Sequence, residues 1–304
     1  MIPFVAEPVA APGVVEALSP LVRRLTAPNA GPFTGPGTGV HLVGHGEVAV
    51  IDPGPRDEAH LRAILQATAG ETITHIFVTH RHLDHSHLAR PLAVLTGAKV
   101  CAGPEPCVSS DGAARLEAGD DLDFHPDVEL RDGQRFTGPG WTIEAVATPG
   151  HTAGHYAFAL AEEDTLFPGD CVMGWSTSVV SPPDGDMAAY MASLGKIRAR
   201  RYARLRPTHG PAIEDPERFL TAYIGHRRLR EAQILETLDL EGASSIRRLV
   251  DRLYGHVDKR LHPAAAHTVL AHLIKLAREG RVECCNGLPT LRAIYRPSRW
   301  RAAA

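Results

Sequence analysis

One short segment constrains this chain more than any other. Residues 78–88, VTHRHLDHSHL, place four histidines and an aspartate within eight positions. The segment follows ITHIFVTH, an apolar run typical of a buried strand, and precedes SHLARPLAVLTG, which has the pattern of an interrupted helix. A polar cluster of this density at the end of a buried strand indicates a chemical site rather than an ordinary loop.

The spacing of these side chains favours metal binding. In an extended segment alternate residues face the same side, so His80 and His82 can converge on one ion. Asp84 and His85, beyond the turn, can serve a second. Imidazole and carboxylate groups are typical ligands of zinc and related divalent ions. The alternative is an exposed histidine cluster without metal, but a match of this kind arises by chance in only about a few chains per thousand.

The rest of the chain predicts an α/β architecture and two domains. Strands alternate with helices up to about residue 102, and strand pairs then follow in VELRDGQRF, WTIEAVAT, HYAFALA and TLFPGD, linked by Asp-Gly, Pro-Gly and Glu-Asp turns. A long helix is expected in DPERFLTAYIGHRRLREAQILETL. Two further helices and a hairpin with an Asn286-Gly287 turn have the order of a winged helix. We therefore expect a catalytic domain at residues 1–225 and a winged-helix-like domain at 226–304.

Charge and cysteine usage limit the cellular context. Residues 1–225 carry a formal charge of −10 and residues 226–304 a charge of +7. The basic unit is either a contact for an anionic partner or a solvated surface. Five cysteines without a CxxC pair, no signal-peptide pattern and no apolar run of membrane-spanning length indicate a cytoplasmic protein without a membrane partner.

Three more polar positions follow predicted strands. TPGHTAGH places His151 after a Pro-Gly turn, FPGD places Asp170 at a strand end, and PTHG places His209 likewise. Each position alone is weak evidence for a metal site, because a single histidine at a strand end more often has a structural role. Their order and spacing after the first motif give them weight together.

The segments IDPG, THRHLDHS, TPGHTAGH, FPGD and PTHG together resemble the ordered motifs of the metallo-β-lactamase superfamily, over residues 20–215. The resemblance implies a four-layer αβ/βα sandwich. It also implies a first metal held by His80, His82 and His151, a second held by Asp84, His85 and His209, a bridging Asp170, and an Asp52 that positions ligands. The set is more similar to glyoxalase II than to true β-lactamases. Cys171 does not match a ligand position and is expected in the core.

The implied chemistry is hydrolysis at a dinuclear centre. Two ions about 3.5–4 Å apart lower the pKa of a bridging water and polarise the bond to be attacked. Asp84 is the expected catalytic residue, because its carboxylate can orient the hydroxide or accept its proton. The ligand types indicate zinc, although iron and manganese also accept nitrogen and oxygen ligands.

The substrate is less constrained than the chemistry. The layout as a whole, with GWSTSVVSPPDGDMAAYMASL after Asp170 and a basic winged helix, resembles the β-lactamase-like protein 2 group. That resemblance implies an endoribonuclease acting on single-stranded RNA, which is our first hypothesis. The second is a thioester or ester hydrolase acting on small molecules, whose winged helix serves as a lid or a homodimer interface. The third is a DNA-binding regulator that uses the metal site as a sensor.

The sequence gives opposing indications on these hypotheses. The basic C-terminal unit favours nucleic acid, whereas the acidic catalytic domain and the lack of Lys and Arg between Cys171 and Tyr190 oppose it. Residues 174–186 form either a substrate wall or a rigid Pro-Pro loop before a helix. In the first case the substrate-binding side chains are Trp175, Ser176, Thr177 and Ser181. His87 is expected to cap the next helix or face solvent, with the cleft as the alternative.

Overall fold

The computed structural model describes residues 1–104 and 119–298. Within them, one sheet has seven strands in the order β1-β2-β3-β4-β5-β6-β7. β1 to β4 pair antiparallel, and β4 to β7 pair parallel. The strands are β1 (Glu16–Ala17), β2 (Val22–Thr26), β3 (Gly39–Val43), β4 (Glu47–Ile51), β5 (Thr72–Val78), β6 (Lys99–Ala102) and β7 (Val128–Glu129).

The second sheet of the described residues has five strands in the order β12-β11-β10-β9-β8. All neighbours pair antiparallel except β11 and β12. Its strands are β8 (Arg135–Gly138), β9 (Trp141–Ala147), β10 (Tyr156–Leu160), β11 (Thr165–Phe167) and β12 (Arg204–Leu205). The inner faces of both sheets meet in one apolar core, to which Ile51 and Phe77 contribute from one side and Phe158 and Phe167 from the other.

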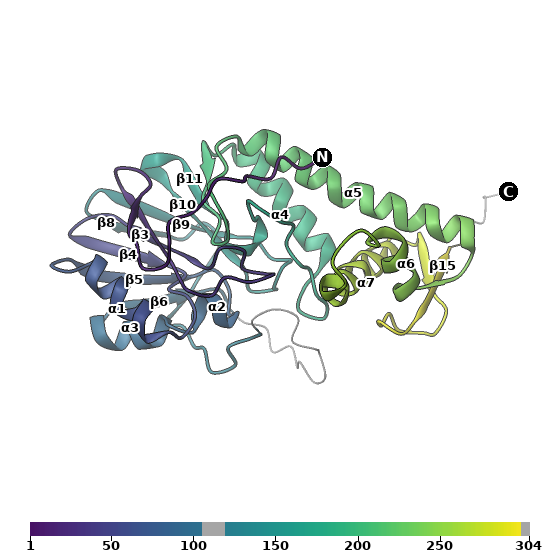
Figure 1. Cartoon of the computed structure of the whole chain (residues 1–304), viewed down its shortest axis with the longest axis horizontal. Coiled ribbons are helices and arrows are strands. Elements are labelled where there is room, and N and C mark those ends of the chain that lie inside the picture. The colour runs from purple at the N-terminus through teal and green to yellow at the C-terminus, as the bar shows by residue number, and fades with distance from the viewer. Residues whose placement is uncertain (105–118, 299–304) are drawn as a thin grey trace.

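Helices cover the outer faces of the two sheets (Figure 1). α1 (Glu58–Ala67) and α3 (Ala89–Thr96) pack on the seven-stranded sheet, and the single turn α2 (Leu83–Ser86) lies between them in the chain. α4 (Met187–Arg200) and the first half of α5 (Pro216–Glu241) pack on the other sheet. The layers are therefore helix, sheet, sheet and helix, which confirms the expected four-layer sandwich.

One expected strand pair was wrong. VELRDGQRF does not form a hairpin across its Asp-Gly turn, because β7 pairs with β6 in the first sheet while β8 pairs with β9 in the second. Gly133, with φ +79, instead turns the chain from one sheet to the other. A local turn signal fits both outcomes, and the packing of the two sheets decides between them.

The C-terminal part is a winged helix built on the end of α5. α6 (Ile246–Leu253) and α7 (His262–Arg278) pack with the second half of α5 around Leu249 and Leu273. β13 (Ser244–Ser245), β14 (Val282–Cys284) and β15 (Ile294–Pro297) form a small antiparallel sheet. The expected hairpin is present, but Cys284 pairs with Tyr295, so its connection is much longer than an Asn-Gly turn. Short 3₁₀ turns occur at Ala161–Glu163, Gly169–Cys171 and Lys259–Leu261.

The winged helix and the sandwich make direct contacts. Ala271 of α7 joins the apolar cluster beneath α4 and α5. Arg278 pairs with Asp186, and the Oγ of Ser181 lies 2.9 Å from Nδ1 of His267. No helix among the described residues has both the length and the apolar character that crossing a membrane requires.

Candidate metal centre

The candidate site lies where parallel strands of both sheets end. β4 and β5 run in the same direction, so Asp52 and His80, which follow them, reach the same edge of the first sheet. β9, β11 and β12 also share one direction, and they lead to His151, Asp170 and His209 at the facing edge of the second sheet. Loops at one edge of a rigid scaffold commonly carry functional groups. The topology explains why Asp52 and Thr208, which are 156 positions apart, meet.

The first histidine motif divides at the start of α2. His80 follows β5, and His82 is the N-cap residue of α2. Asp84 and His85 lie within that single turn and are both buried. The chain therefore changes from extended to helical between the two pairs, while the ring centroids of His80 and His85 stay 4.1 Å apart.

Two triads of potential ligand atoms result. In the first, Nδ1 of His82 lies 2.8 Å from Nε2 of His80 and 3.2 Å from Nε2 of His151. In the second, Nε2 of His209 lies 3.2 Å from Nε2 of His85 and 3.3 Å from Oδ2 of Asp84. Each triad is compact enough to hold one metal ion.

Asp170 lies between the two triads. Its Oδ1 is 3.5 Å from Nε2 of both His85 and His209, and its Oδ2 is 3.9 Å from Nε2 of His151. His80, His85 and Asp170 themselves form a third group of metal-binding size. One carboxylate thus touches ligands of both triads.

The polar atoms of this cluster fit a bound cation. A nitrogen of a neutral imidazole is either a hydrogen-bond donor or an acceptor. Nδ1 of His82 faces Nε2 of both His80 and His151, so both of those nitrogens would have to take the opposite role. Oδ1 of Asp170 is buried and has no hydrogen-bond partner in the described structure. Buried polar atoms are normally paired, so convergence of lone pairs on one volume indicates a site for divalent metal.

Backbone carbonyls and a carboxylate hold three of the imidazoles by their other nitrogen. Nδ1 of His151 is 2.7 Å from the carbonyl of Val179, and Nδ1 of His209 is 3.3 Å from that of Gly37. Nδ1 of His85 is 2.9 Å from Oδ2 of Asp52. A ring nitrogen facing such an acceptor carries the proton, which leaves Nε2 as a lone pair toward the cluster.

Asp52 also ties the surrounding loops together. This fully buried carboxylate accepts hydrogen bonds from the backbone N–H of Thr79 at 2.8 Å and from the hydroxyls of Thr79 and Thr208 at 2.9 and 2.8 Å. Its backbone has a φ of +50. The sequence predicted a ligand-positioning role for Asp52 but missed the two threonines, whose hydroxyls give no distinctive signal.

The local electrostatics suit the ligand forms of His82 and Asp84. For His85 and His209, burial lowers the pKa of the ring, but the neighbouring carboxylates outweigh burial and raise that pKa. Burial, reinforced by the neighbouring His151, lowers the pKa of His82 to about 3, so its ring is neutral at pH 7. Burial raises the pKa of Asp84, but the charge of His85 and the hydrogen bond from His209 outweigh it and bring that pKa to about 2. Metal ions bind neutral imidazole and ionised carboxylate.

His155 is a buried neighbour of the site that sequence analysis missed. Its Nε2 accepts the backbone N–H of Asp170 at 3.2 Å, and its Nδ1 lies 2.8 Å from the hydroxyl of Thr148. Gly169, with φ +52, permits this approach, because a Cβ there would meet Nε2 of His155 at 2.7 Å. The second histidine of TPGHTAGH was the available signal.

The predicted substrate-wall residues divide into two sets. Trp175, Ser176 and Thr177 line one pocket together. Ser181 does not line it, and its hydroxyl contacts His267 of α7 instead. His87 is the C-cap residue of α2 and belongs to none of the metal-sized groups. Cys171 is buried in the apolar core, where burial raises its pKa to about 12.

Comparison with known proteins identifies the family. Residues 35–209 match the family model described as the metallo-beta-lactamase superfamily. The chain belongs to the metallo-beta-lactamase superfamily. Residues 245–284 match the beta-lactamase associated winged helix domain, which is a companion of this superfamily.

Curated proteins extend the similarity over most of the chain. A beta-lactamase-like protein 2 homolog from Drosophila melanogaster is 34% identical and covers 93% of this chain and 99% of its own length. The atrochrysone carboxyl ACP thioesterase AgnL7 from Paecilomyces divaricatus is 31% identical, over 88% of this chain and 83% of its own. The chain is thus a hydrolase of this superfamily with a cluster able to bind metal.

Solved structures of superfamily members agree with the fold. A beta-lactamase domain protein from Burkholderia ambifaria covers 97% of both chains with a TM-score of 0.80 at 21% identity. The protein TTHA1623, crystallised in a di-iron-bound form, is 29% identical with a TM-score of 0.52 and covers 66% of this chain and 95% of its own.

Proposed function

We propose that this chain hydrolyses thioesters with the aid of two divalent metal ions. The observation that carries the proposal is the position of Asp170, whose two carboxylate oxygens face two separate triads of ligand atoms. The thioesterase activity named for AgnL7 supports the choice of bond, because that relative aligns with most of this chain.

The ligand roles follow the two triads. His80, His82 and His151 would hold one ion, Asp84, His85 and His209 the other, and Asp170 would contact both. When bound, the ions supply an activated water and polarise the carbonyl that it attacks. Asp52 keeps the ring of His85 in place through the hydrogen bond from Nδ1.

Asp84 is the proposed catalytic residue among the chain's own groups. Its carboxylate is ionised at neutral pH, so it acts as a proton acceptor rather than an acid. Of its two oxygens, Oδ2 faces His209, and the carboxylate can take the proton of the attacking water. Most of the proposed ligand side chains are buried, which limits the access of bulk water to the site.

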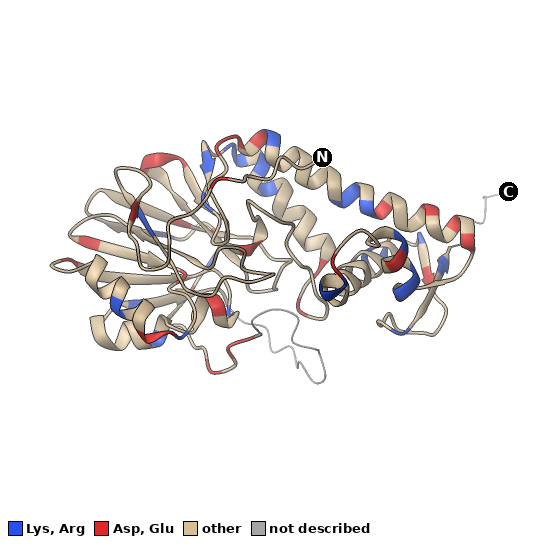
Figure 2. Cartoon of the chain, viewed as in Figure 1, with Lys and Arg blue, Asp and Glu red and all other residues tan. Residues whose placement is uncertain are grey.

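Single-stranded RNA is the second candidate substrate. The +7 charge of residues 226–304 favours it, because basic surfaces attract the phosphate backbone. Several of these arginines are already engaged by carboxylates of the same unit: Arg248 and Arg252 both contact Glu241, and Arg296 contacts Glu283. Figure 2 shows both kinds of charge along α5 and in the winged helix. We therefore place the thioester first.

Zinc remains our first expectation for the metal, from the nitrogen and oxygen ligands. The di-iron form of TTHA1623 supports iron as the alternative, and manganese also accepts this ligand set. Elemental analysis of protein purified without added metal, followed by activity after reloading with each ion, distinguishes them.

A parallel assay tests the function. Metal-loaded protein is given octanoyl-coenzyme A and a single-stranded RNA oligomer, with Asp170→Ala as the control. Because Cys285 is exposed and Cys284 partly so, product acid is measured by chromatography instead of a thiol reagent. We expect hydrolysis of the thioester that Asp170→Ala abolishes. RNA cleavage that Asp170→Ala abolishes, together with no hydrolysis of the thioester, would select single-stranded RNA as the substrate.

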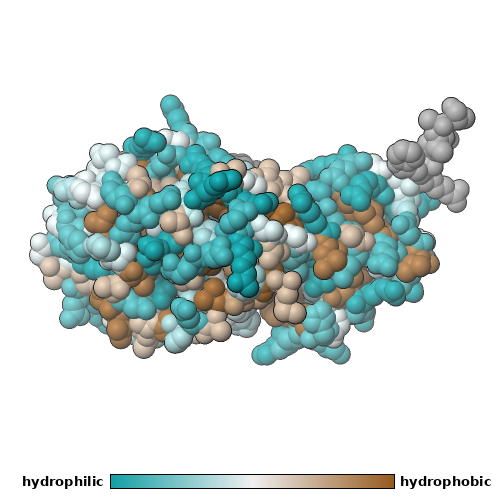
Figure 3. Space-filling model, turned by 90° about the horizontal axis from the view of Figure 1, so that it is seen from above, coloured by the Kyte–Doolittle hydropathy of each residue, from teal (hydrophilic) through white to brown (hydrophobic). Residues whose placement is uncertain are grey.

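The winged helix is proposed to act as a lid or as a homodimer interface. In Figure 3 apolar residues on the face shown form small patches separated by hydrophilic ones. Light scattering after size-exclusion chromatography measures the oligomeric state. A dimer that loses activity when it dissociates at low protein concentration would support the winged helix as a homodimer interface. A fully active monomer would support the winged helix as a lid.

A further inference from the structure

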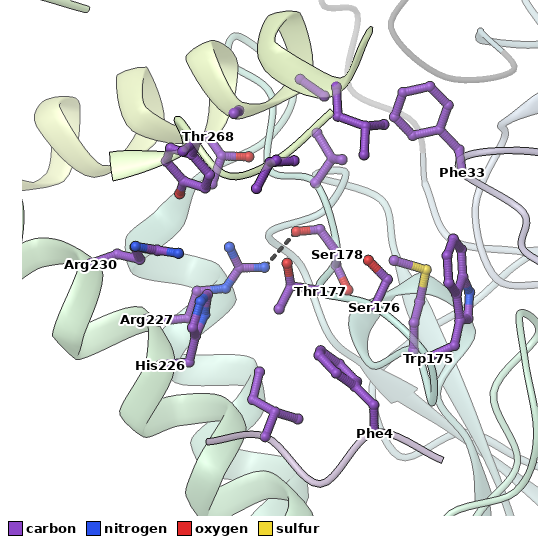
Figure 4. A pocket seen from close by; sticks show the side chains of 18 of the residues that line it. Phe4, Phe33, Trp175, Ser176, Thr177, Ser178, His226, Arg227, Arg230 and Thr268 are labelled. Atoms are coloured by element: carbon purple, nitrogen blue, oxygen red, sulfur yellow. Dashed lines mark hydrogen bonds between the residues drawn. The ribbon is translucent and has the colours of Figure 1, made fainter. Parts of the chain in front are cut away.

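A pocket of about 360 Å³ lies at the junction of the sandwich and the winged helix (Figure 4). Its walls come from the N-terminal segment, the loop at Phe33, residues 173–179, helix α5, and residues 254–268. None of the seven proposed metal ligands is among its described lining residues. Its volume is within the range of small-molecule sites.

Two guanidinium groups give the pocket a positive charge. Arg227 and Arg230 project from α5 into it (Figure 4), and its described lining includes no aspartate or glutamate. Neither arginine forms an ion pair within the described part of the chain, and the Nε of each is buried without a hydrogen-bond partner. Unpaired buried charge is unfavourable. An anion bound between the two guanidinium groups would pair both charges.

The two arginines are held firmly in place. Arg227 is only 2% exposed, donates from Nη2 to the carbonyl of Ser178, and lies 5.1 Å above the ring of Tyr190. Arg230 lies 4.6 Å above the ring of Tyr254 and donates to Oε1 of Gln233. Preorganised guanidinium groups are suited to carboxylate recognition, because little side-chain freedom is lost on binding.

The rest of the pocket is mainly apolar. Phe4, Phe33 and Trp175 stand opposite the arginines in Figure 4, and the helix α7 side adds aliphatic residues. Trp175 is held against the backbone of Gly210, where an added Cβ would lie 2.9 Å from the indole ring. Apolar walls facing a cationic end match a molecule with an apolar body and one anionic end.

We propose that this pocket binds an apolar carboxylate, with its carboxylate at Arg227 and Arg230 and its apolar body against Phe33 and Trp175. The site is separate from the metal centre and does not depend on the substrate that the centre hydrolyses. Its wall nevertheless contacts that centre, because Val179 accepts the hydrogen bond from Nδ1 of His151.

His226 reports the charge of the pocket. Burial and the charges of Arg227 and Arg230 lower the pKa of this histidine to about 4. A carboxylate bound beside the two arginines would offset their charge, so the pKa of His226 should rise on binding. Nuclear magnetic resonance of the histidine ring protons measures that change.

Calorimetric titration of the metal-loaded protein with octanoate tests the proposal, with 1-octanol as the neutral analogue of equal length. We expect octanoate to bind and octanol to bind at least about tenfold more weakly, as expected for loss of a charged hydrogen bond. Equal affinity for the two compounds would overturn the proposal. Tighter binding of adenosine 3′-monophosphate than of octanoate would also overturn it and indicate a nucleotide site.

Matched variants locate the site. Arg230→Gln should weaken octanoate about tenfold, whereas Arg228→Gln, the same change at an exposed position of α5, should leave its affinity within about twofold. Arg227→Gln should also weaken it, and the Arg230 variant decides the case if Arg227→Gln does not fold. Unchanged affinity in Arg230→Gln contradicts the assignment.

Two further readouts separate this pocket from the metal centre. Octanoate should still bind Asp170→Ala, since the pocket does not include that residue. Binding should change the fluorescence of Trp175, and Trp175→Phe should lose that change while still binding octanoate by calorimetry. Loss of binding in Asp170→Ala would place octanoate at the metal centre instead and overturn the proposal.

Discussion

Oδ2 of Asp52 lies 2.9 Å from Nδ1 of His85, and this contact fixes a proposed ligand from a residue 33 positions earlier in the chain. The same oxygen accepts the hydroxyl of Thr208, from the loop after β12. One buried carboxylate therefore links the ends of strands in both sheets. The metal centre is held by a connection across the sandwich, not by local sequence alone.

Replacing Asp52 by asparagine should lower metal affinity about 10- to 100-fold, because the amide cannot supply the same acceptors to His85 and both threonines. Competition with a chromophoric chelator measures the change. Asp57→Asn provides the control: this residue caps α1 by accepting from His60, and asparagine caps equally well. Equal metal affinity in both variants would show that Asp52 does not position His85.

Within the first motif, His82→Ala should abolish turnover while His87→Ala should retain it. His82 lies in a triad and His87 lies in none among the described residues. Metal content by elemental analysis and kcat under saturating substrate distinguish the two variants, and circular dichroism checks the fold. Full activity in His82→Ala would contradict the proposed ligand set.

His155 is predicted to be a positioning residue. His155→Leu removes the acceptor for the backbone N–H of Asp170 and leaves that donor buried, a loss of about 1–3 kcal/mol of stability. We expect kcat to fall with KM little changed, because Asp170 shifts while the substrate contacts remain. His155→Gln, which keeps an acceptor, should recover part of kcat. A pure stability loss with normal kcat would refute the positioning role.

Removing the metal should lower the melting temperature by several degrees, because ions bind the folded state and not the separated ligands. Dialysis against a chelator followed by calorimetry gives the shift, and adding back zinc, iron or manganese should reverse it. In Asp170→Ala the chelator should have a smaller effect. A melting temperature indifferent to the chelator in the parent protein would argue against a structural contribution from metal.

Glu231 in α5 should make stability depend on pH. Burial raises its pKa, but hydrogen bonds from His272 and Lys275 outweigh this and lower it. A carboxylate with a depressed folded pKa contributes stability above its unfolded pKa of about 4.3, and this contribution is lost as pH falls through the folded value. Glu231→Gln should therefore cost about 1–3 kcal/mol at pH 7.

The urea unfolding free energies of the parent and Glu231→Gln give the measurement. Their difference should be constant between pH 7 and 5 and shrink below about pH 4. Glu236→Gln, the same change at an exposed position of α5, should show no such trend. A pH-independent difference for Glu231→Gln would mean that the effect is packing rather than charge.

The sequence predicted the elements whose signals are local. The buried strand before His80 and the long helix α5 are both indicated by short-range patterns, and the structure has each of them. The order of the five motifs along the chain indicated the family through its resemblance to the superfamily pattern. The ligand roles, the domain limits and the substrate residues stay predictions.

The rest depended on contacts between distant segments. Nothing local separates β7 from β8 into different sheets, and nothing local marks His155 as the partner of Asp170. The pocket at Arg227 could not be predicted for the same reason. The sequence of α5 has the pattern of an ordinary amphipathic helix, and the pocket forms only where residues 173–179 pack beside it. Long-range packing decided each of these.

Helix α5 spans 26 residues, about 39 Å at 1.5 Å per residue. Phe219 and Tyr223 at one end complete the core beneath α4, and Ile234 and Leu238 at the other complete the core of the winged helix. A cut between residues 225 and 226 would leave each of these side chains with its own half, but it would break the helix between them and separate Arg227 from the carbonyl of Ser178. Because one continuous helix runs through both cores, the two halves should unfold together, and thermal denaturation should proceed in a single cooperative step.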